Sequence, residues 1–189
     1  MAELLLFHHA QGLTDGCRHF ADRLRAGGQV VHTPDLYDGQ TFGTLDDGMR
    51  HAEQELGFAT ILERGRAAAN DLPNEIVYAG LSLGVLPAQM LAQTRSGARG
   101  ALLLHAAIPT SEFGGAWPAG VPLQIHTMAD DALGDVDVAR ELARTIEGAE
   151  LFLYPGKRHL FSDDGLPDYD AAATTLLTER LLTFLDAIG

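Results

Sequence analysis

Residues 77–90 read VYAGLSLGVLPAQM and place Ser82 between two glycines, Gly80 and Gly84. The apolar residues before the serine are typical of a buried strand, and those after it are typical of a helix. A sharp strand-to-helix turn strains the serine backbone and projects the hydroxyl above the sheet. Glycine fits the flanking positions because a Cβ there would clash with neighbouring elements. The stretch therefore indicates either a nucleophilic serine or a small hydroxyl in a glycine-rich turn.

The rest of the chain repeats this alternation of strand and helix. Apolar runs that we expect to be strands occupy residues 3–8, 29–33, 75–79, 100–105, 121–127 and 150–154. Segments with helical spacing occupy residues 15–26, 49–71, 85–95, 135–147 and 169–188. Most of the strands are apolar throughout, as in parallel sheets that are covered on both faces. We predict one α/β domain over residues 1–189, with a mainly parallel sheet of six strands, or seven as the alternative, flanked by helices on both faces.

Two segments, 34–48 and 106–120, are rich in Gly, Pro, Asp and Thr and are expected to be loops. Both would follow the carboxyl ends of strands. Open α/β sheets bind their ligands at that edge, so we expect the site there.

The composition limits the function classes. Thirteen Lys and Arg against 26 Asp and Glu give a formal charge of −13, which repels phosphate backbones and argues against nucleic-acid binding. The apolar runs, such as 101–108, are too short to span a bilayer, and the N-terminus does not resemble a signal peptide. Cys17 is the only cysteine, so an internal disulfide is excluded. We expect a cytoplasmic monomer or homodimer without membrane or nucleic-acid partners.

A serine hydroxyl becomes a good nucleophile when a histidine held by a carboxylate removes its proton. In the α/β-hydrolase order, the acid and then the histidine follow the serine. His105 and His126 lie in or at the end of apolar strands, where we expect structural roles. His159 lies in YPGKRHLFSDD (154–164), between the last strand and the last helix, and is the candidate base. The alternative for His159 is a solvated loop histidine.

The acid should follow a strand between the serine and the histidine, and LQIHTMADDALGD (123–135) offers three aspartates. Asp131 is preferred and Asp130 is the alternative. Asp135 is expected as an N-cap or first-turn residue of the next helix, and capping is an alternative for all three. An oxyanion would need two backbone N–H donors, for which we expect Leu83 and Ala10.

Three segments together resemble the dienelactone hydrolase family of the α/β-hydrolase superfamily. They are GLSLG (80–84), TPDLYDG (33–39) and YPGKRHLFSDDGLPDYD (154–170), and the resemblance covers nearly the whole chain. The six expected strands agree with a trimmed version of that fold, with spatial order 2-1-3-4-5-6 and Ser82 after the third strand. The chain has no room for a cap domain.

The resemblance implies that Ser82 is the nucleophile, Asp131 the acid and His159 the base, with Ala10 as an oxyanion donor and His9 just before it. Dienelactone hydrolases proper have a cysteine nucleophile and a glutamate at the position of His9, so their thiolate–glutamate switch is absent here.

Two residues are tentative substrate contacts: His9, expected to line the site, and Arg158, a cation beside the candidate base. We find no match for the arginines that hold the substrate carboxylate in the proper enzymes. We therefore expect another small ester or lactone as the substrate.

The sequence thus predicts a serine hydrolase that cleaves a small carboxylic ester or lactone through an acyl-enzyme, with no cofactor. Adjacent strand residues point to opposite faces, so His8 and His9 are not expected to chelate a metal, and His8 is expected to be packed. A non-catalytic protein that binds a small molecule or a partner is one alternative. An acyltransferase that uses the same triad toward another acceptor is the other.

Overall fold

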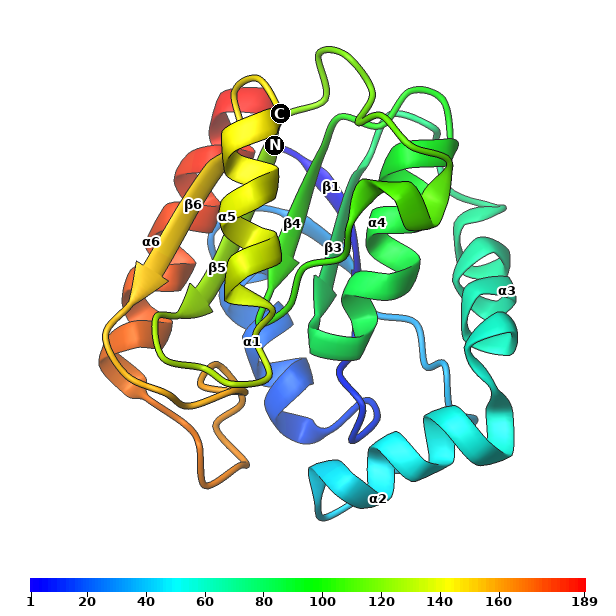
Figure 1. Ribbon diagram of the computed structural model, residues 1–189, viewed down its shortest axis with the longest axis vertical. Helices are drawn as coiled ribbons and strands as arrows, with labels where there is room; N and C mark the ends of the chain where they lie inside the picture. Colours follow the sequence, from blue (N-terminus) through cyan, green and yellow to red (C-terminus); the bar gives the residue numbers. More distant parts are fainter.

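Six short apolar runs lie side by side in one parallel sheet in the computed structural model, which describes all of residues 1–189 (Figure 1). The strands are β1 (Glu3–Phe7), β2 (Val30–His32), β3 (Val77–Leu81), β4 (Gly100–Leu104), β5 (Leu123–Met128) and β6 (Glu150–Tyr154). Their order is β2-β1-β3-β4-β5-β6, and all neighbouring strands are parallel. The predicted strand order is confirmed, and the strand number is six.

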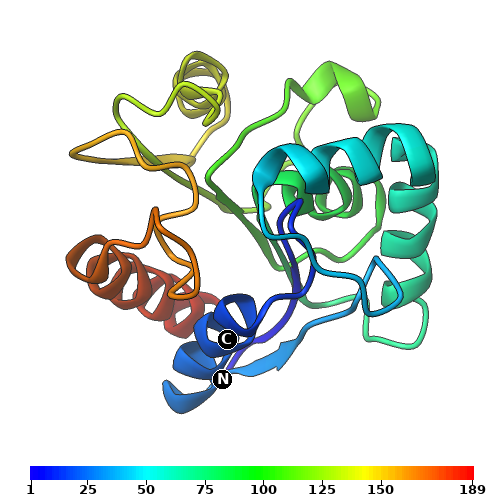
Figure 2. The ribbon, with the colours of Figure 1, turned by 90° about the horizontal axis from the view of Figure 1, so that it is seen from below.

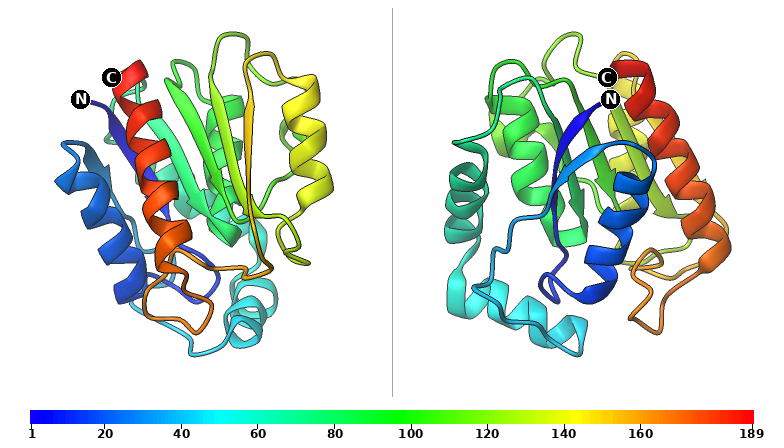
Figure 3. Two further views of the ribbon diagram at one scale, coloured as in Figure 1. Left: turned by 90° about the vertical axis from the view of Figure 1, so that its left-hand side faces the viewer. Right: turned by 180° about the vertical axis from the view of Figure 1, so that it is seen from behind.

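Helices cover both faces of the sheet, as the uniformly apolar strands predict (Figure 3). On one face lie α1 (Asp15–Ala26) and α6 (Ala171–Ile188), and on the other lie α3 (Phe58–Ala69), α4 (Val85–Thr94) and α5 (Val136–Thr145). Along β1, Leu5 packs into the core on the α4 side, whereas Leu4 packs into the core on the α1 side. Alternate residues of one strand therefore build two cores.

A third group of helical residues crosses the carboxyl ends of the strands (Figure 2). It consists of α2 (Leu45–Arg50) and a π-helical turn, η1 (His51–Leu56), which precede α3. The prediction of one helix over 49–71, preceded by a loop over 34–48, was wrong, because α2 begins at Leu45 and the helical segment is divided into α2, η1 and α3. The helix begins earlier because the Thr44 side chain accepts a hydrogen bond from the backbone N–H of Asp47 at 3.1 Å. It is interrupted at Gly57, whose φ of 80° is left-handed.

The predicted loop 106–120 contains one short 3₁₀ helix, η3 (Thr110–Phe113), and is otherwise irregular. Pro87 is the third residue of α4, in the first turn, where its missing N–H breaks no intrahelical bond. None of the helices is long and apolar enough to cross a membrane.

Candidate active site

Ser82 lies at the turn between β3 and α4, as the first residue of the 3₁₀ helix η2 (Ser82–Gly84). Its φ of 49° is in the left-handed region, which is strained for a residue with a side chain. The two flanking glycines make this turn possible. A Cβ on Gly80 would lie 2.1 Å from the carbonyl oxygen of Gly84, and a Cβ on Gly84 would lie 2.4 Å from that of Phe7. The turn is thus packed against β1 by backbone contacts that only glycine allows.

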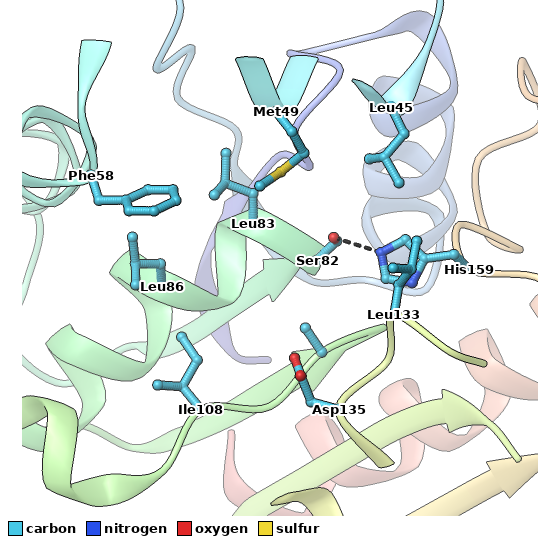
Figure 4. A pocket seen from close by; sticks show the side chains of 11 residues that line it. Leu45, Met49, Phe58, Ser82, Leu83, Leu86, Ile108, Leu133, Asp135 and His159 are labelled. Atoms are coloured by element: carbon cyan, nitrogen blue, oxygen red, sulfur yellow. Dashed lines mark hydrogen bonds between the residues drawn. The ribbon is translucent and has the colours of Figure 1, made fainter. Parts of the chain in front are cut away.

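A continuous series of hydrogen bonds links Ser82 to His159 and Asp131. The Ser82 hydroxyl lies 2.8 Å from Nε2 of His159 (Figure 4), and Nδ1 of His159 lies 2.8 Å from Oδ2 of Asp131. Because the carboxylate accepts the proton of Nδ1, Nε2 is left to accept the proton of the serine hydroxyl. The three side chains come from the loops that follow β3, β5 and β6.

Two further contacts hold this series in place. Oδ1 of Asp131 accepts the backbone N–H of Leu133 at 2.9 Å, and the backbone N–H of His159 donates to Oδ2 of Asp168 at 3.2 Å. Asp130 is exposed, and its backbone N–H donates to the carbonyl of Gly156. The structure therefore places Asp131, and not Asp130, against the histidine.

The predicted oxyanion donors lie in two segments, the turn that contains Ser82 and the loop after β1. Leu83 is the second residue of η2, where backbone N–H groups have no intrahelical acceptor. The backbone N–H of Ala10, in the loop after β1, makes no hydrogen bond. This loop is held from outside by α2, since a Cβ on Gly48 would lie 2.2 Å from the carbonyl oxygen of Ala10.

A cavity of about 270 Å³ opens beside Ser82 (Figure 4). Most of its wall is apolar: Leu45, Met49, Phe58, Leu83, Leu86, Ala106, Ile108 and Leu133. The polar side chains on the wall are Ser82, His159 and Asp135. Helix α2 supplies Leu45, from the segment predicted to be a loop, and Met49, the first residue of the predicted helix over 49–71. A second cavity of about 210 Å³ lies on another side of His159 and is bounded by Leu45, Leu166 and Asp168 among others.

Asp135 occupies the N-cap position of α5, as predicted, but its side chain makes no capping hydrogen bond. Instead the carboxylate points into the cavity (Figure 4). Burial, together with the charge of Asp131, raises the pKa of this carboxyl, although the backbone of Ala107 and the charge of His159 oppose the shift.

His9 does not line the cavity. Its ring is buried, and Nε2 donates to Oδ2 of Asp163 at 2.8 Å. The backbone N–H of Gln11 donates to Nδ1 at 3.2 Å, which places the ring proton on Nε2. The Thr14 hydroxyl donates to the same carboxylate oxygen at 2.6 Å. His9 thus ties the loop after β1 to the loop that carries His159.

The Asp163 carboxylate is charged in this setting. Burial raises the pKa of its carboxyl, but the hydrogen bonds from His9 and Thr14 outweigh burial and hold the pKa below its usual value. Cys17 lies nearby, with Sγ 3.9 Å from Oδ2. His9, Cys17 and Asp163 could in principle bind a metal, but a metal on Nε2 would require a proton on Nδ1, which faces the N–H of Gln11. The hydrogen-bond pattern therefore does not fit a metal ion.

Arg158 also lies away from the cavity wall. Its Nη1 donates to the backbone carbonyl of Tyr169 at 2.7 Å and approaches Asp170 at 3.5 Å. These contacts fasten the loop after β6 to the start of α6. The structure gives neither Arg158 nor His9 a contact with the cavity beside Ser82.

Three of the other buried histidines are those for which packed or structural roles were predicted from the sequence. His8 donates through Nδ1 to the carbonyl of His9 and accepts the N–H of Leu36 at 3.0 Å, and burial lowers its pKa to about 4. His105 bonds to Ser162 and His126 to Tyr154, at 2.7 and 3.0 Å. Burial lowers the pKa of both. All three are packed and hydrogen-bonded, as predicted from the sequence.

Several contributors to the site were not predicted from the sequence. Thr44, with acidic residues two and three positions further on, is a helix-start signal that would have indicated α2, and with it Leu45 and Met49. No local signal marks Asp163 as the partner of His9, which is 154 positions away.

A profile of the dienelactone hydrolase family matches residues 3–189. Among solved structures, a dienelactone hydrolase-like promiscuous phosphotriesterase from metagenomic libraries has a TM-score of 0.77 and 18% identity, with 100% of this chain and 87% of that chain covered. A putative α/β-superfamily hydrolase from Xanthomonas campestris has a TM-score of 0.66 and 21% identity, with 99% of both chains covered. A dienelactone hydrolase from Anabaena variabilis has a TM-score of 0.73 and 16% identity, with 100% and 87% covered. Comparison with curated protein sequences finds no match.

Proposed function

We propose that this chain, which belongs to the dienelactone hydrolase family and has the α/β-hydrolase fold, is a serine hydrolase that cleaves small carboxylic esters or lactones. The observation that carries the proposal is the series Ser82–His159–Asp131, with 2.8 Å between each pair of bonded atoms. A left-handed serine at a strand-to-helix turn and an apolar cavity beside it support the same conclusion.

In the first half of the reaction, His159 removes the proton of Ser82 as its Oγ attacks the carbonyl carbon. Asp131 orients the imidazole and stabilises the imidazolium that forms. The backbone N–H groups of Leu83 and Ala10 stabilise the oxyanion of the tetrahedral intermediate. The intermediate collapses when His159 returns its proton to the leaving alkoxide, and an acyl-enzyme remains.

In the second half, His159 removes a proton from water, which attacks the acyl carbonyl. Collapse of the second intermediate breaks the bond to Ser82, and the serine regains its proton from His159. An ester yields an acid and an alcohol. A lactone yields one hydroxy acid, because the alkoxide stays attached to the acyl group.

The cavity supports a small and largely apolar substrate. Its volume of about 270 Å³ is just below the range of about 300–1,000 Å³ that is usual for ligand pockets, and its wall contains no Lys or Arg. A substrate carboxylate would find no cation there, so we propose neutral or cationic esters and lactones rather than dienelactone.

Covalent labelling tests whether Ser82 is the nucleophile. We expect a fluorophosphonate to label the wild-type protein and the Ser111→Ala variant, in which an exposed serine is removed, but not Ser82→Ala. Failure to label the wild type, or equal labelling of Ser82→Ala, would contradict the proposal.

A matched pair of aspartate variants tests the acid. Asp131→Asn should lower kcat for 4-nitrophenyl acetate by about 10⁴-fold, the loss seen when the acid of a serine triad becomes an amide. Asp130→Asn removes the neighbouring exposed carboxylate and should leave kcat within about twofold, because surface changes away from a site have small effects. Similar losses in the two variants would argue against Asp131 as the acid.

A further inference from the structure

One ionisable carboxylate stands in the apolar cavity beside Ser82 and takes no part in the proposed reaction. Asp135 lines this cavity together with eight hydrophobic residues, and the only other ionisable side chain on the wall is His159. The carboxylate enters from the wall between Ile108 and His159 (Figure 4). A negative charge therefore faces the space that a substrate would fill.

Within the fold, the backbone of Ala107 and the nearby His159 favour this charge, but no Lys or Arg pairs with it. Asp135 is the N-cap residue of α5 but caps no N–H group, and it forms no ion pair with Lys or Arg. Its backbone is left-handed, with φ at 49°, a conformation that aspartate tolerates. Asparagine and glycine tolerate it at least as well, so the backbone explains a residue of this kind but not a negative charge.

The surroundings of the carboxylate favour a positively charged partner. Burial raises the pKa of Asp135, and the nearby Asp131 carboxylate repels its charge, while His159 and the backbone of Ala107 act in the opposite sense. A partly desolvated charge is stabilised most by an opposite charge placed close to it. No Lys or Arg lines the cavity, and the His159 ring is hydrogen-bonded to Asp131, so a permanent opposite charge for Asp135 would have to come from the substrate.

We infer that Asp135 is a specificity-determining residue that selects esters carrying a cationic group, such as an alkylammonium, on the part that occupies this cavity. This inference rests on the proposed esterase function and names the substrate class within it. The apolar wall contacts the methyl or methylene groups of the substrate, and Asp135 contacts the cationic centre. A carboxylate at the same place in the substrate would be repelled.

The expected selectivity follows from the partial exposure of Asp135. A charge about 5 Å from a carboxylate interacts appreciably at an effective dielectric constant of about 20, but solvent screening at an open cavity reduces the effect. We therefore expect kcat/KM to be about tenfold higher for a cationic ester than for a neutral ester of equal shape.

Three 4-nitrophenyl esters test this inference, with acyl chains of equal length that end in trimethylammonium, tert-butyl or carboxylate. The first two have nearly the same shape and differ in charge. In the wild type, the ratio of kcat/KM for the trimethylammonium ester to that for the tert-butyl ester should be about ten, and the carboxylate ester should be the poorest. In Asp135→Asn, this ratio should fall to about one.

Asp137→Asn is the matched control. It removes the same charge two positions further along the chain, where the side chain is 97% exposed and pairs with Arg140. We expect this variant to keep the wild-type ratio. The overall acidity of the chain attracts any cation, so a ratio that falls equally in both variants would assign the effect to the surface charge and overturn the inference.

A second measurement does not depend on turnover. Fluorophosphonates with trimethylammonium and tert-butyl ends should label wild-type Ser82 at rates that differ by the same factor, about ten, and Asp135→Asn should remove the difference. If both reagents label Ser82 at equal rates and the neutral ester is hydrolysed, the inference is wrong while the proposed function stands. If neither reagent labels Ser82 and no ester is cleaved, the proposed function fails and this inference fails with it.

Discussion

Replacing Asp163 by alanine should both destabilise the protein and impair its site. The carboxylate is buried and accepts three hydrogen bonds from nitrogen and oxygen donors: from Nε2 of His9 at 2.8 Å, from the Thr14 hydroxyl at 2.6 Å and from the backbone N–H of Gly165 at 2.8 Å. The first two donors belong to the loop after β1, which carries Ala10, and Asp163 belongs to the loop that carries His159. The variant would remove the connection between these two loops.

The expected loss in the free energy of unfolding depends on which hydrogen-bond donors Asp163→Ala leaves without an acceptor. The Nε2–H of His9 is buried and would lose its acceptor, whereas the Thr14 hydroxyl and the Gly165 N–H are partly accessible to water. Leaving a buried donor without an acceptor costs about 1–3 kcal/mol, and two further hydrogen bonds to the carboxylate are lost with it, so we expect a total loss of about 3–5 kcal/mol. That is a large part of the roughly 5–15 kcal/mol that stabilises a domain. Asp163→Asn keeps one oxygen for His9 and Thr14 and turns its amide toward Gly165, so about 2 kcal/mol should be lost.

Urea unfolding at 25 °C measures these losses as changes in the free energy of unfolding. Turnover of 4-nitrophenyl acetate measures the effect on the site, and we expect kcat/KM of Asp163→Ala to fall by about 10- to 100-fold through misplacement of the two loops. Asp164→Ala is the control, because Asp164 pairs with the exposed His19 and should contribute little. A loss below about 1 kcal/mol in Asp163→Ala, with unchanged turnover, would refute the role of Asp163.

Three further changes have definite expected outcomes. Gly84→Ala places a Cβ 2.4 Å from the carbonyl oxygen of Phe7, so β1 and the turn must separate; we expect a loss of about 3 kcal/mol in urea unfolding, and a loss below about 1 kcal/mol would contradict this packing. Ile108→Trp fills part of the 270 Å³ cavity, so kcat/KM should fall more for 4-nitrophenyl hexanoate than for the acetate, whereas equal effects would place the acyl chain elsewhere. The lowered pKa of Asp163 stabilises the fold fully above the ordinary aspartate value of about 3.9, and this contribution is lost as the pH falls through the lower folded value. Asp163→Asn should therefore lose less stability than the wild type between about pH 5 and about pH 2. Parallel curves of unfolding free energy against pH for the two proteins would contradict a lowered pKa at Asp163.

The sheet was predictable from the sequence because its signal is local. Each strand is a short apolar run bounded by turn residues. Because the sheet is buried on both faces, the strand residues are apolar at nearly every position instead of at every second one. The bounds of α1 and β6 coincide with the predicted 15–26 and 150–154. The strand order was also predictable, because the resemblance to an α/β-hydrolase assigned one order to six parallel strands.

The crossing segment, α2 with η1, shows where the local signal failed. The apolar spacing over 49–71 is that of one helix, yet the chain forms α2, a π-helical turn and α3. Packing decides this, since Gly48 contacts the backbone of Ala10 and the left-handed Gly57 redirects the chain. Such contacts with a distant loop leave little trace in the periodicity of a segment.

By itself, the sequence determined the turn around Ser82, because the steric demand for glycine at two neighbouring positions is a property of a few adjacent residues. Only the tertiary structure decided which side chains meet there. It placed Asp131 rather than Asp130 against His159, joined His9 to Asp163, and turned Asp135 into the cavity instead of toward the helix it precedes. These choices depend on how loops separated by many residues close over one sheet edge. Asp130 and Asp131 are adjacent in such a loop, yet one carboxylate is exposed to solvent and the other contacts His159. Because both residues are aspartates, residue type alone cannot show which of them contacts the histidine.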